Sequence, residues 1–92
     1  MATVHVIGAG LAGLNSALRL AERGAAVRLY EGSTHAGGRC RSYRDAQLDR
    51  VIDNGNHLIF AGNHAAQRYM RAIGSADRMI DSGEAVFPFF DA

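Results

Sequence analysis

The sequence has little of what stabilises secreted or membrane-spanning proteins. Its single cysteine, Cys40, cannot form an internal disulfide, and this usage suits a reducing compartment. No run approaches the ~20 apolar residues that cross a bilayer. The apolar stretch 4–14 is not a typical signal peptide, because no basic residue precedes it and three glycines interrupt it. The sequence therefore predicts a cytoplasmic protein without a transmembrane segment.

Lysine is absent, and the charges nearly cancel. All ten basic residues are arginines, there are nine acidic residues, and the net charge is +1. The arginines are scattered rather than clustered, which argues against a nucleic acid as partner. Arginine together with abundant alanine is typical of a GC-rich, bacterial genome. At 92 residues the chain is long enough for one small core but short for an enzyme with its own substrate pocket.

The first third of the chain has the pattern of strand, helix and strand. The β-branched run Thr3–Ile7 ends at a glycine and predicts a buried parallel strand. Apolar residues then recur at helical spacing through Arg23, and Gly24 is placed to end the helix. Residues 26–30 form the second strand. This order is a βαβ unit, which requires parallel strands and a right-handed crossover, so the predicted fold class is α/β.

The middle of the chain predicts a loop followed by a hairpin. Residues 32–38 are small and polar, which is typical of a loop. Two short strands are expected at 42–44 and 48–52, around a turn near Asp45.

The last third predicts one more helix and an extended run. Asn63 is expected to cap a helix that continues to Ile73 and ends at Gly74. The run 85–90 is expected to be extended, and no closing element follows it. The chain is therefore expected to be one N-terminal segment, residues 1–92, of an incomplete Rossmann-like domain, with the substrate domain absent.

A glycine-rich turn follows the first strand. Gly8-Ala9-Gly10-Leu11-Ala12-Gly13 matches G-x-G-x-x-G, in which the first glycine permits a tight turn out of the strand. Gly10 has no Cβ to block a pyrophosphate, and Gly13 allows the helix to pack close to the sheet. The helix that begins near Leu11 directs its free N–H groups, including that of Ala12, towards the phosphates. The turn predicts a dinucleotide-binding site.

Glu31 strengthens this prediction. It ends the second strand, 21 positions after Gly10, where a carboxylate accepts hydrogen bonds from the adenosine ribose hydroxyls. Its charge would repel the 2′-phosphate of NADP. The alternative, a structural turn followed by a surface glutamate, does not account for the whole arrangement of strand, turn, helix and acid.

A second glycine motif indicates which dinucleotide binds. Gly37-Gly38-Arg39-Cys40-Arg41-Ser42 resembles the G-G-R-x-x-S element that many FAD-dependent oxidases and desaturases carry after the ribose-binding acid. Paired glycines allow a close approach of backbone to cofactor, and the guanidinium of Arg39 can neutralise phosphate. The motif favours FAD, although a merely flexible turn and a solvated Arg41 remain open. Cys40 is expected to be a small, partly buried residue beside the turn.

Together these motifs resemble the flavin-containing amine oxidase and phytoene desaturase superfamily. Within it, the chain is similar to the squalene-associated FAD-dependent desaturases, the hydroxysqualene dehydroxylase family of bacterial hopanoid biosynthesis. The narrower likeness rests on residues 37–42, 53–58 (Asp-Asn-Gly-Asn-His-Leu) and 87–91 (Phe-Pro-Phe-Phe-Asp). Members of this group often have glutamine in place of Asn56.

The resemblance implies an FAD-dependent oxidoreductase, several times longer than this chain, that converts an apolar isoprenoid substrate, hydroxysqualene, to squalene. It leaves open an amine oxidase, a carotenoid desaturase, a protoporphyrinogen oxidase, or a non-catalytic nucleotide-binding module. No catalytic residue can be assigned. His57 is the one candidate near the expected flavin face, and a backbone-bonding role is favoured over catalysis. The histidines lack metal-ligand spacing, so no metal is expected.

The unpaired apolar surfaces lead to a further expectation. Two parallel strands alone are marginal in water, and the apolar helix face and the run 87–90 would lack partners. The 92 residues alone are therefore expected to be catalytically silent, to bind FAD poorly and to self-associate. Peripheral membrane association of a longer parent is left open.

Overall fold

The computed structural model describes residues 2–55 and 58–91. These form two compact units, Met1–Leu58 and Ile59–Ala92, which are described separately.

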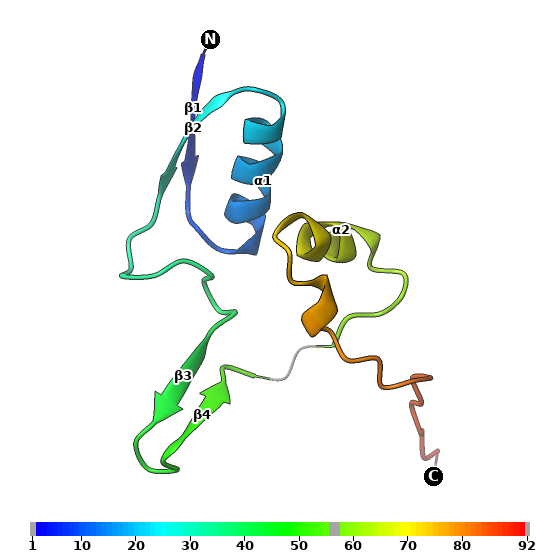
Figure 1. Ribbon diagram of the computed structural model, residues 1–92. Helices are drawn as coiled ribbons and strands as arrows, with labels where there is room; N and C mark the ends of the chain where they lie inside the picture. Colours follow the sequence, from blue (N-terminus) through cyan, green and yellow to red (C-terminus); the bar gives the residue numbers. More distant parts are fainter. Residues whose placement is uncertain (1, 56–57, 92) are drawn as a thin grey trace. The chain divides into compact units, whose positions relative to one another are not determined.

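The first unit begins with the predicted βαβ arrangement (Figure 1). Strand β1 (Thr3–Ile7) leads into helix α1 (Leu11–Glu22), which returns the chain to strand β2 (Ala26–Tyr30). The strands pair in parallel, with Thr3 opposite Ala26 and Ile7 opposite Tyr30. Parallel pairing of neighbouring strands requires a crossover, and α1 supplies it. The predicted α/β fold class is confirmed.

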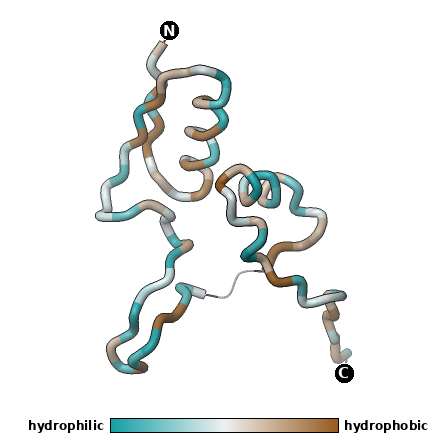
Figure 2. The backbone as a smooth tube through the Cα atoms, viewed as in Figure 1, coloured by the Kyte–Doolittle hydropathy of each residue, from teal (hydrophilic) through white to brown (hydrophobic). Residues whose placement is uncertain are grey.

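One face of the β1–β2 pair is covered by α1. Val4 and Val6 are half-buried, whereas Thr3, His5 and Ile7 on the alternate face are exposed, Ile7 to 87%. The alternation follows from the two-residue period of a strand. Figure 2 shows hydrophobic and hydrophilic stretches alternating along α1, as expected for a helix with one covered face. The prediction that β1 is buried is therefore wrong for one of its faces, because within the described part of the first unit α1 covers the other face.

Helix α1 ends just before Gly24, as predicted, although its last residue is one position before the expected Arg23. Its last residue is Glu22, and Arg23 follows as the C-cap. Gly24 adopts a left-handed conformation with φ of +86°, and its N–H donates to the carbonyl of Ala21 at 2.9 Å. This is a common way to end a helix, since glycine has no Cβ to oppose a positive φ.

A hairpin follows the loop after β2. Strands β3 (Ser42–Asp45) and β4 (Arg50–Asp53) are antiparallel, and Ser42 lies opposite Asp53. Residues 46–49 form the turn, so the predicted inclusion of residues 48 and 49 in the second strand is wrong.

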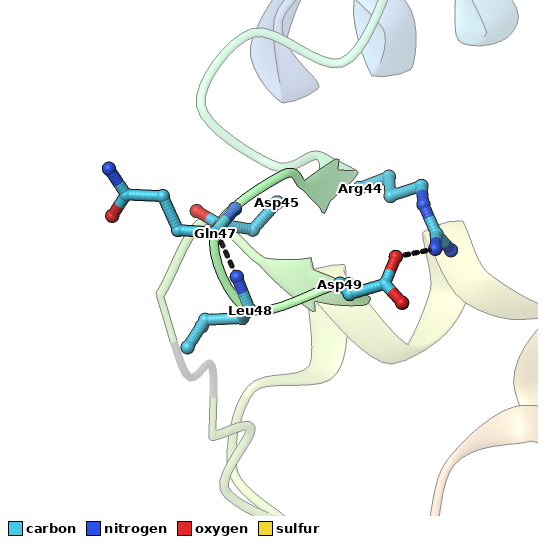
Figure 3. Close-up of polar contacts among 5 residues, drawn as sticks. All are labelled: Arg44, Asp45, Gln47, Leu48 and Asp49. Atoms are coloured by element: carbon cyan, nitrogen blue, oxygen red, sulfur yellow. Dashed lines mark hydrogen bonds and ion pairs between the residues drawn. The ribbon is translucent and has the colours of Figure 1, made fainter.

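The side chain of Asp45 explains where the turn lies. One of its carboxylate oxygens accepts hydrogen bonds from the N–H groups of Gln47 and Leu48, both at 2.9 Å. These bonds hold Leu48 in the turn and outside the β ladder. Across the turn, Arg44 forms an ion pair with Asp49, which has a φ of +52° (Figure 3).

The second unit contains helix α2 (His64–Ala72) and the 3-10 turn η1 (Ala76–Arg78). Asn63 precedes α2 as predicted, but its side chain makes no capping bond to the helix. Its amide oxygen instead accepts a hydrogen bond from the N–H of Phe60 at 2.8 Å. Gly74 follows the helix with a φ of +77°. Residues 85–90, predicted to be extended, form no strand and are exposed.

Candidate functional site

The glycine-rich turn joins β1 to α1 at very short range. Gly8 has a φ of +100°, and its N–H donates to the carbonyl of Tyr30 at 2.7 Å, which extends the pairing with β2. A Cβ placed on Gly13 would lie 1.7 Å from the carbonyl oxygen of Gly8. No side chain fits in that space, so the glycine at position 13 is what lets α1 pack against the turn.

Gly10 differs from Gly13 because it faces open space. A Cβ added there would meet no described atom within 4 Å. Gly10 is also the N-cap of α1, and no side chain of the described residues caps the helix. The first-turn N–H groups, including those of Leu11 and Ala12, have no intrahelical acceptors. Open space thus lies beside N–H groups at the positive end of a helix, which suits an anion.

Ala9 connects this turn to the other two motifs. It is 1% exposed, and it is the one residue classed as buried within the described part of the chain. Its N–H donates to Oε1 of Glu31 at 2.9 Å, and its carbonyl accepts from the N–H of Gly37 at 2.7 Å. The backbone N–H and carbonyl of the buried Ala9 are thus both hydrogen-bonded, one to Glu31, the ribose-binding candidate, and the other to the second glycine motif.

Glu31 is held in its charged form. Its other oxygen, Oε2, accepts a hydrogen bond from the N–H of Ser33 at 2.9 Å. The backbone of Ser33, followed by that of Ala9, lowers the pKa of Glu31 from its ordinary value of 4.5. A carboxylate has about four lone-pair positions, so two bonds leave acceptor capacity for a ligand.

The second glycine motif forms a tight turn against the first. Gly37 and Gly38 have φ values of +112° and +61°. A Cβ on Gly37 would lie 2.7 Å from the carbonyl oxygen of Cys40, and a Cβ on Gly38 would lie 3.2 Å from Cα of Gly10. Side chains are therefore disfavoured at both positions. The structure brings together two motifs that are almost 30 residues apart in the sequence.

The two arginines of the motif have different surroundings. The guanidinium of Arg41 lies over the ring of Tyr43, 4.8 Å from its centre, which is a cation–π geometry. Arg39 is exposed, and within residues 2–55 and 58–91 it forms no ion pair. Arg39 therefore remains the candidate for phosphate, whereas Arg41 has a partner within the protein. Cys40 is half-buried, as predicted.

Residues 53–54 join the same assembly, for which the sequence suggested no role. The N–H of Asn54 donates to the carbonyl of Arg41 at 2.9 Å, and its side-chain Nδ2 donates to the carbonyl of Arg39 at 3.0 Å. The hydroxyl of Ser42 donates to Asp53 at 2.5 Å. The register of the predicted hairpin could have indicated this role, because pairing of Ser42 with Asp53 places Asn54 next to Arg41.

Several predictions remain outside this assembly. His57 and Asn56 lie outside the described residues. Among the residues that the structure describes, no three histidine, cysteine or acidic side chains gather at one point, and no helix is long and apolar enough to cross a membrane.

Comparison with known proteins supports this description. Residues 6–73 match the model of the NAD(P)-binding Rossmann-like domain. The hydroxysqualene dehydroxylase of Rhodopseudomonas palustris is 55% identical over 89 residues, which cover 97% of this chain and 21% of that protein. The protein of the same name from Zymomonas mobilis is 48% identical over 91 residues, or 99% of this chain and 22% of that protein. A zeta-carotene desaturase of Capsicum annuum is 34% identical over 77 residues, which are 84% of the chain and 13% of the desaturase.

These matches agree with the resemblance drawn from the sequence motifs. The similarity to hydroxysqualene dehydroxylases is confirmed over nearly the whole chain, and the chain spans about a fifth of the length of those curated relatives. The family match begins near the end of β1 and covers α1, β2, both glycine motifs, the hairpin and α2. The chain belongs to the family of NAD(P)-binding Rossmann-like domains.

Proposed function

We propose that this chain binds the ADP half of FAD as the N-terminal part of a flavin-dependent oxidoreductase. The observation that carries the proposal is the bonding of Ala9, whose N–H meets Glu31 and whose carbonyl meets Gly37. The residues that we propose for phosphate and ribose, and the second glycine motif, are thereby bonded around one buried residue.

Each part of the site matches a part of the ligand. The open side of Gly10 leaves room for a pyrophosphate, and the N–H groups of Leu11, Ala12 and Gly13 at the start of α1 suit its charge. The oriented carboxylate of Glu31 suits the two ribose hydroxyls. Gly37 and Gly38 bring backbone to the same turn, and the exposed Arg39 follows them.

The site favours FAD over NADP on electrostatic grounds. The carboxylate of Glu31 is charged at neutral pH, and the backbone bonds of Ser33 and Ala9 lower its pKa further, so a 2′-phosphate on the adenosine ribose would face repulsion. The glycine pair with Arg39 distinguishes FAD from NAD, since the element is typical of flavin-dependent oxidases and desaturases.

For the complete enzyme we propose the reductive loss of the allylic hydroxyl of hydroxysqualene, which gives squalene. Relatives that carry this activity in their name match nearly the whole chain. Reduced flavin would supply the hydride and become oxidised, while the hydroxyl would take up a proton and leave as water; an external electron donor would then reduce the flavin again. The residues described here bind and orient the cofactor through its phosphates and ribose, and the apolar isoprenoid substrate is expected to contact later sequence.

The test is a chimera in which this chain replaces the matched segment of the Rhodopseudomonas palustris protein. Titration with FAD, NAD and NADP should show the tightest binding for FAD, with the flavin spectrum of the purified protein as a second readout. Conversion of hydroxysqualene to squalene by the chimera is expected, measured by product analysis.

The native relative and a chimera carrying Gly10→Val are the controls. Flavin in the native relative and in the chimera, but not in the variant, supports the proposed site. Tightest binding of NADP by the chimera would contradict it, and so would full flavin loading of the Gly10→Val variant.

A further inference from the structure

Three hydrogen bonds tie the end of the hairpin to the second glycine motif. Asn54 donates from its backbone N–H to Arg41 and from its side chain to Arg39, and Ser42 donates to Asp53. The backbone bond and the Ser42 bond continue the antiparallel pairing of β3 and β4. The side chain of Asn54 instead bonds the carbonyl of Arg39, which lies before the start of β3.

That carbonyl belongs to a short turn, in which the N–H of Cys40 donates to the carbonyl of Gly37 at 3.1 Å. Gly37 and Gly38 both have positive φ values, and glycine has the largest conformational freedom of any residue. On one side the segment is held by the bond from Gly37 to the Ala9 carbonyl. On the other side the bonds to Asn54 hold it. Arg39 lies between these two anchors.

The position of Arg39 matters for the ligand. It directly follows Gly38, which lies close to the phosphate turn, since a Cβ on Gly38 would be 3.2 Å from Cα of Gly10. A guanidinium carries five N–H donors and remains charged, so its contribution to phosphate binding depends strongly on placement. Arg41 does not compete for this role, since its guanidinium stacks on Tyr43.

We infer that Asn54 is a positioning residue, which fixes the Arg39 backbone so that the guanidinium can meet the pyrophosphate of the dinucleotide. The inference rests on the proposed function and adds to it a residue beyond the glycine motifs and Glu31. It also gives a physical role to Asn54, which lies in one of the stretches that carry the resemblance to the family.

The experiment is a double-mutant cycle in the flavin-binding chimera. Arg39→Ala and Asn54→Ala should each weaken FAD binding about tenfold, as expected for loss of one charge-assisted contact. The double variant should lose about the same factor of ten, because each change disables the same contact. The loss should shrink at high salt for both single variants, since the lost attraction is electrostatic.

Two control variants separate positioning from general stability. Ser42→Ala removes the hydrogen bond from the Ser42 hydroxyl to Asp53 but leaves both Asn54 bonds, so FAD affinity should stay within about twofold. Asn54→Leu is close in size, adds no charge and keeps the backbone bond but loses the Nδ2 donor, so it should behave as Asn54→Ala. Thermal unfolding of each variant checks that it is folded, and Asn54→Leu replaces the alanine variant if that one does not fold.

The outcomes are distinguishable. A loss of about one hundredfold in the double variant would overturn the inference, because the two residues would then act independently. An Asn54→Leu variant with unchanged affinity beside a weakened Arg39→Ala variant would overturn it as well. Normal flavin binding by Gly10→Val would instead remove the proposed function on which the inference rests.

Discussion

The two units of the chain differ in the hydrogen bonds within each of them. In the unit Met1–Leu58, hydrogen bonds join residues far apart in sequence, such as Ala9 with Glu31 and Arg39 with Asn54. In the unit Ile59–Ala92, the described side-chain hydrogen bonds join residues at most seven positions apart, as between Gln67 and Phe60. Side-chain hydrogen bonds thus join distant parts of the first unit, whereas those described in the second unit are local.

Burial follows the same division. Ala9 in the first unit is 1% exposed, whereas Phe89 and Phe90 in the second are 92% and 94% exposed. In the second unit, Phe60 and Phe87 form a tilted aromatic pair with ring centres 6.0 Å apart. Small residues dominate the closely packed turn, and large apolar residues dominate the exposed segment. Substitutions are therefore expected to affect the two units in different ways.

The largest effect is expected from Gly13→Ala, which should unfold the first unit. The new Cβ would overlap the carbonyl oxygen of Gly8, so α1 would have to move away from the turn. The cost is expected to be about 3 kcal/mol or more, which is a large part of the stability of a small domain. Circular dichroism and thermal unfolding measure it. Gly10→Ala is the matched control and should unfold normally, because its Cβ meets open space.

Next in size is the effect of Gly10→Val on cofactor loading. The backbone at Gly10 is extended, with φ of −74° and ψ of −175°, which valine adopts readily. The protein should therefore fold, while the side chain occupies the space that the pyrophosphate needs. Flavin absorbance per protein after purification should fall to background. A folded variant with normal flavin content would mean that phosphate does not approach Gly10.

In the flavin-binding chimera, Glu31→Ala should weaken FAD binding about tenfold or more, because a charge-assisted bond to the ribose is lost. The same change leaves the N–H groups of Ala9 and Ser33 without their acceptor, so a loss of stability should accompany it. Isothermal titration with FAD measures the first effect. Affinity equal to that of the unaltered protein would show that the carboxylate does not contact the ribose.

The pH dependence of the first unit should follow Glu31. Its pKa is lowered on folding, so its contribution to stability is present above the ordinary value of 4.5 and is lost as pH falls through the lowered pKa. Unfolding midpoints compared between the unaltered protein and Glu31→Gln should therefore differ at neutral pH and converge in acid. A difference that grows on acidification would contradict the assignment.

The smallest effect on the site is expected from the double change Phe89→Ser and Phe90→Ser. Both rings are almost fully exposed in the second unit, and exposed apolar groups favour association. The 92-residue chain is expected to self-associate, and the double variant should do so less in size-exclusion chromatography. The unfolding midpoint of the first unit should not change. A monodisperse unaltered chain would refute the expectation of self-association.

The sequence predicted the elements of the first unit well, because their signals are local. The β-branched run of β1, the helical spacing of α1 and Gly24 at its end each predict their own conformation. The assembly of the motifs is not local. Nothing in the identity of Ala9, the first variable position of the glycine motif, indicates that its N–H and carbonyl connect Glu31 to Gly37.

The errors have the same origin. Leu48 is apolar and was assigned to a strand, but the Asp45 carboxylate accepts a hydrogen bond from its N–H and keeps it in the turn. Asn63 precedes α2 as a cap should, but its side chain turns back to Phe60. In both cases a side-chain bond to backbone competes with the regular structure that the residue pattern favours.

The bonds of Ala9 also bear on the order of folding. They close segments of 22 and 28 residues, counted from position 9 to 31 and to 37. Such contacts form only after the entropy of loop closure has been overcome, so local structure in α1 is expected to form earlier. The amide proton of Ala9 would then gain protection from hydrogen exchange later than those of the helix. A cofactor that binds only after this late closure would slow unfolding while leaving the early steps of folding unchanged.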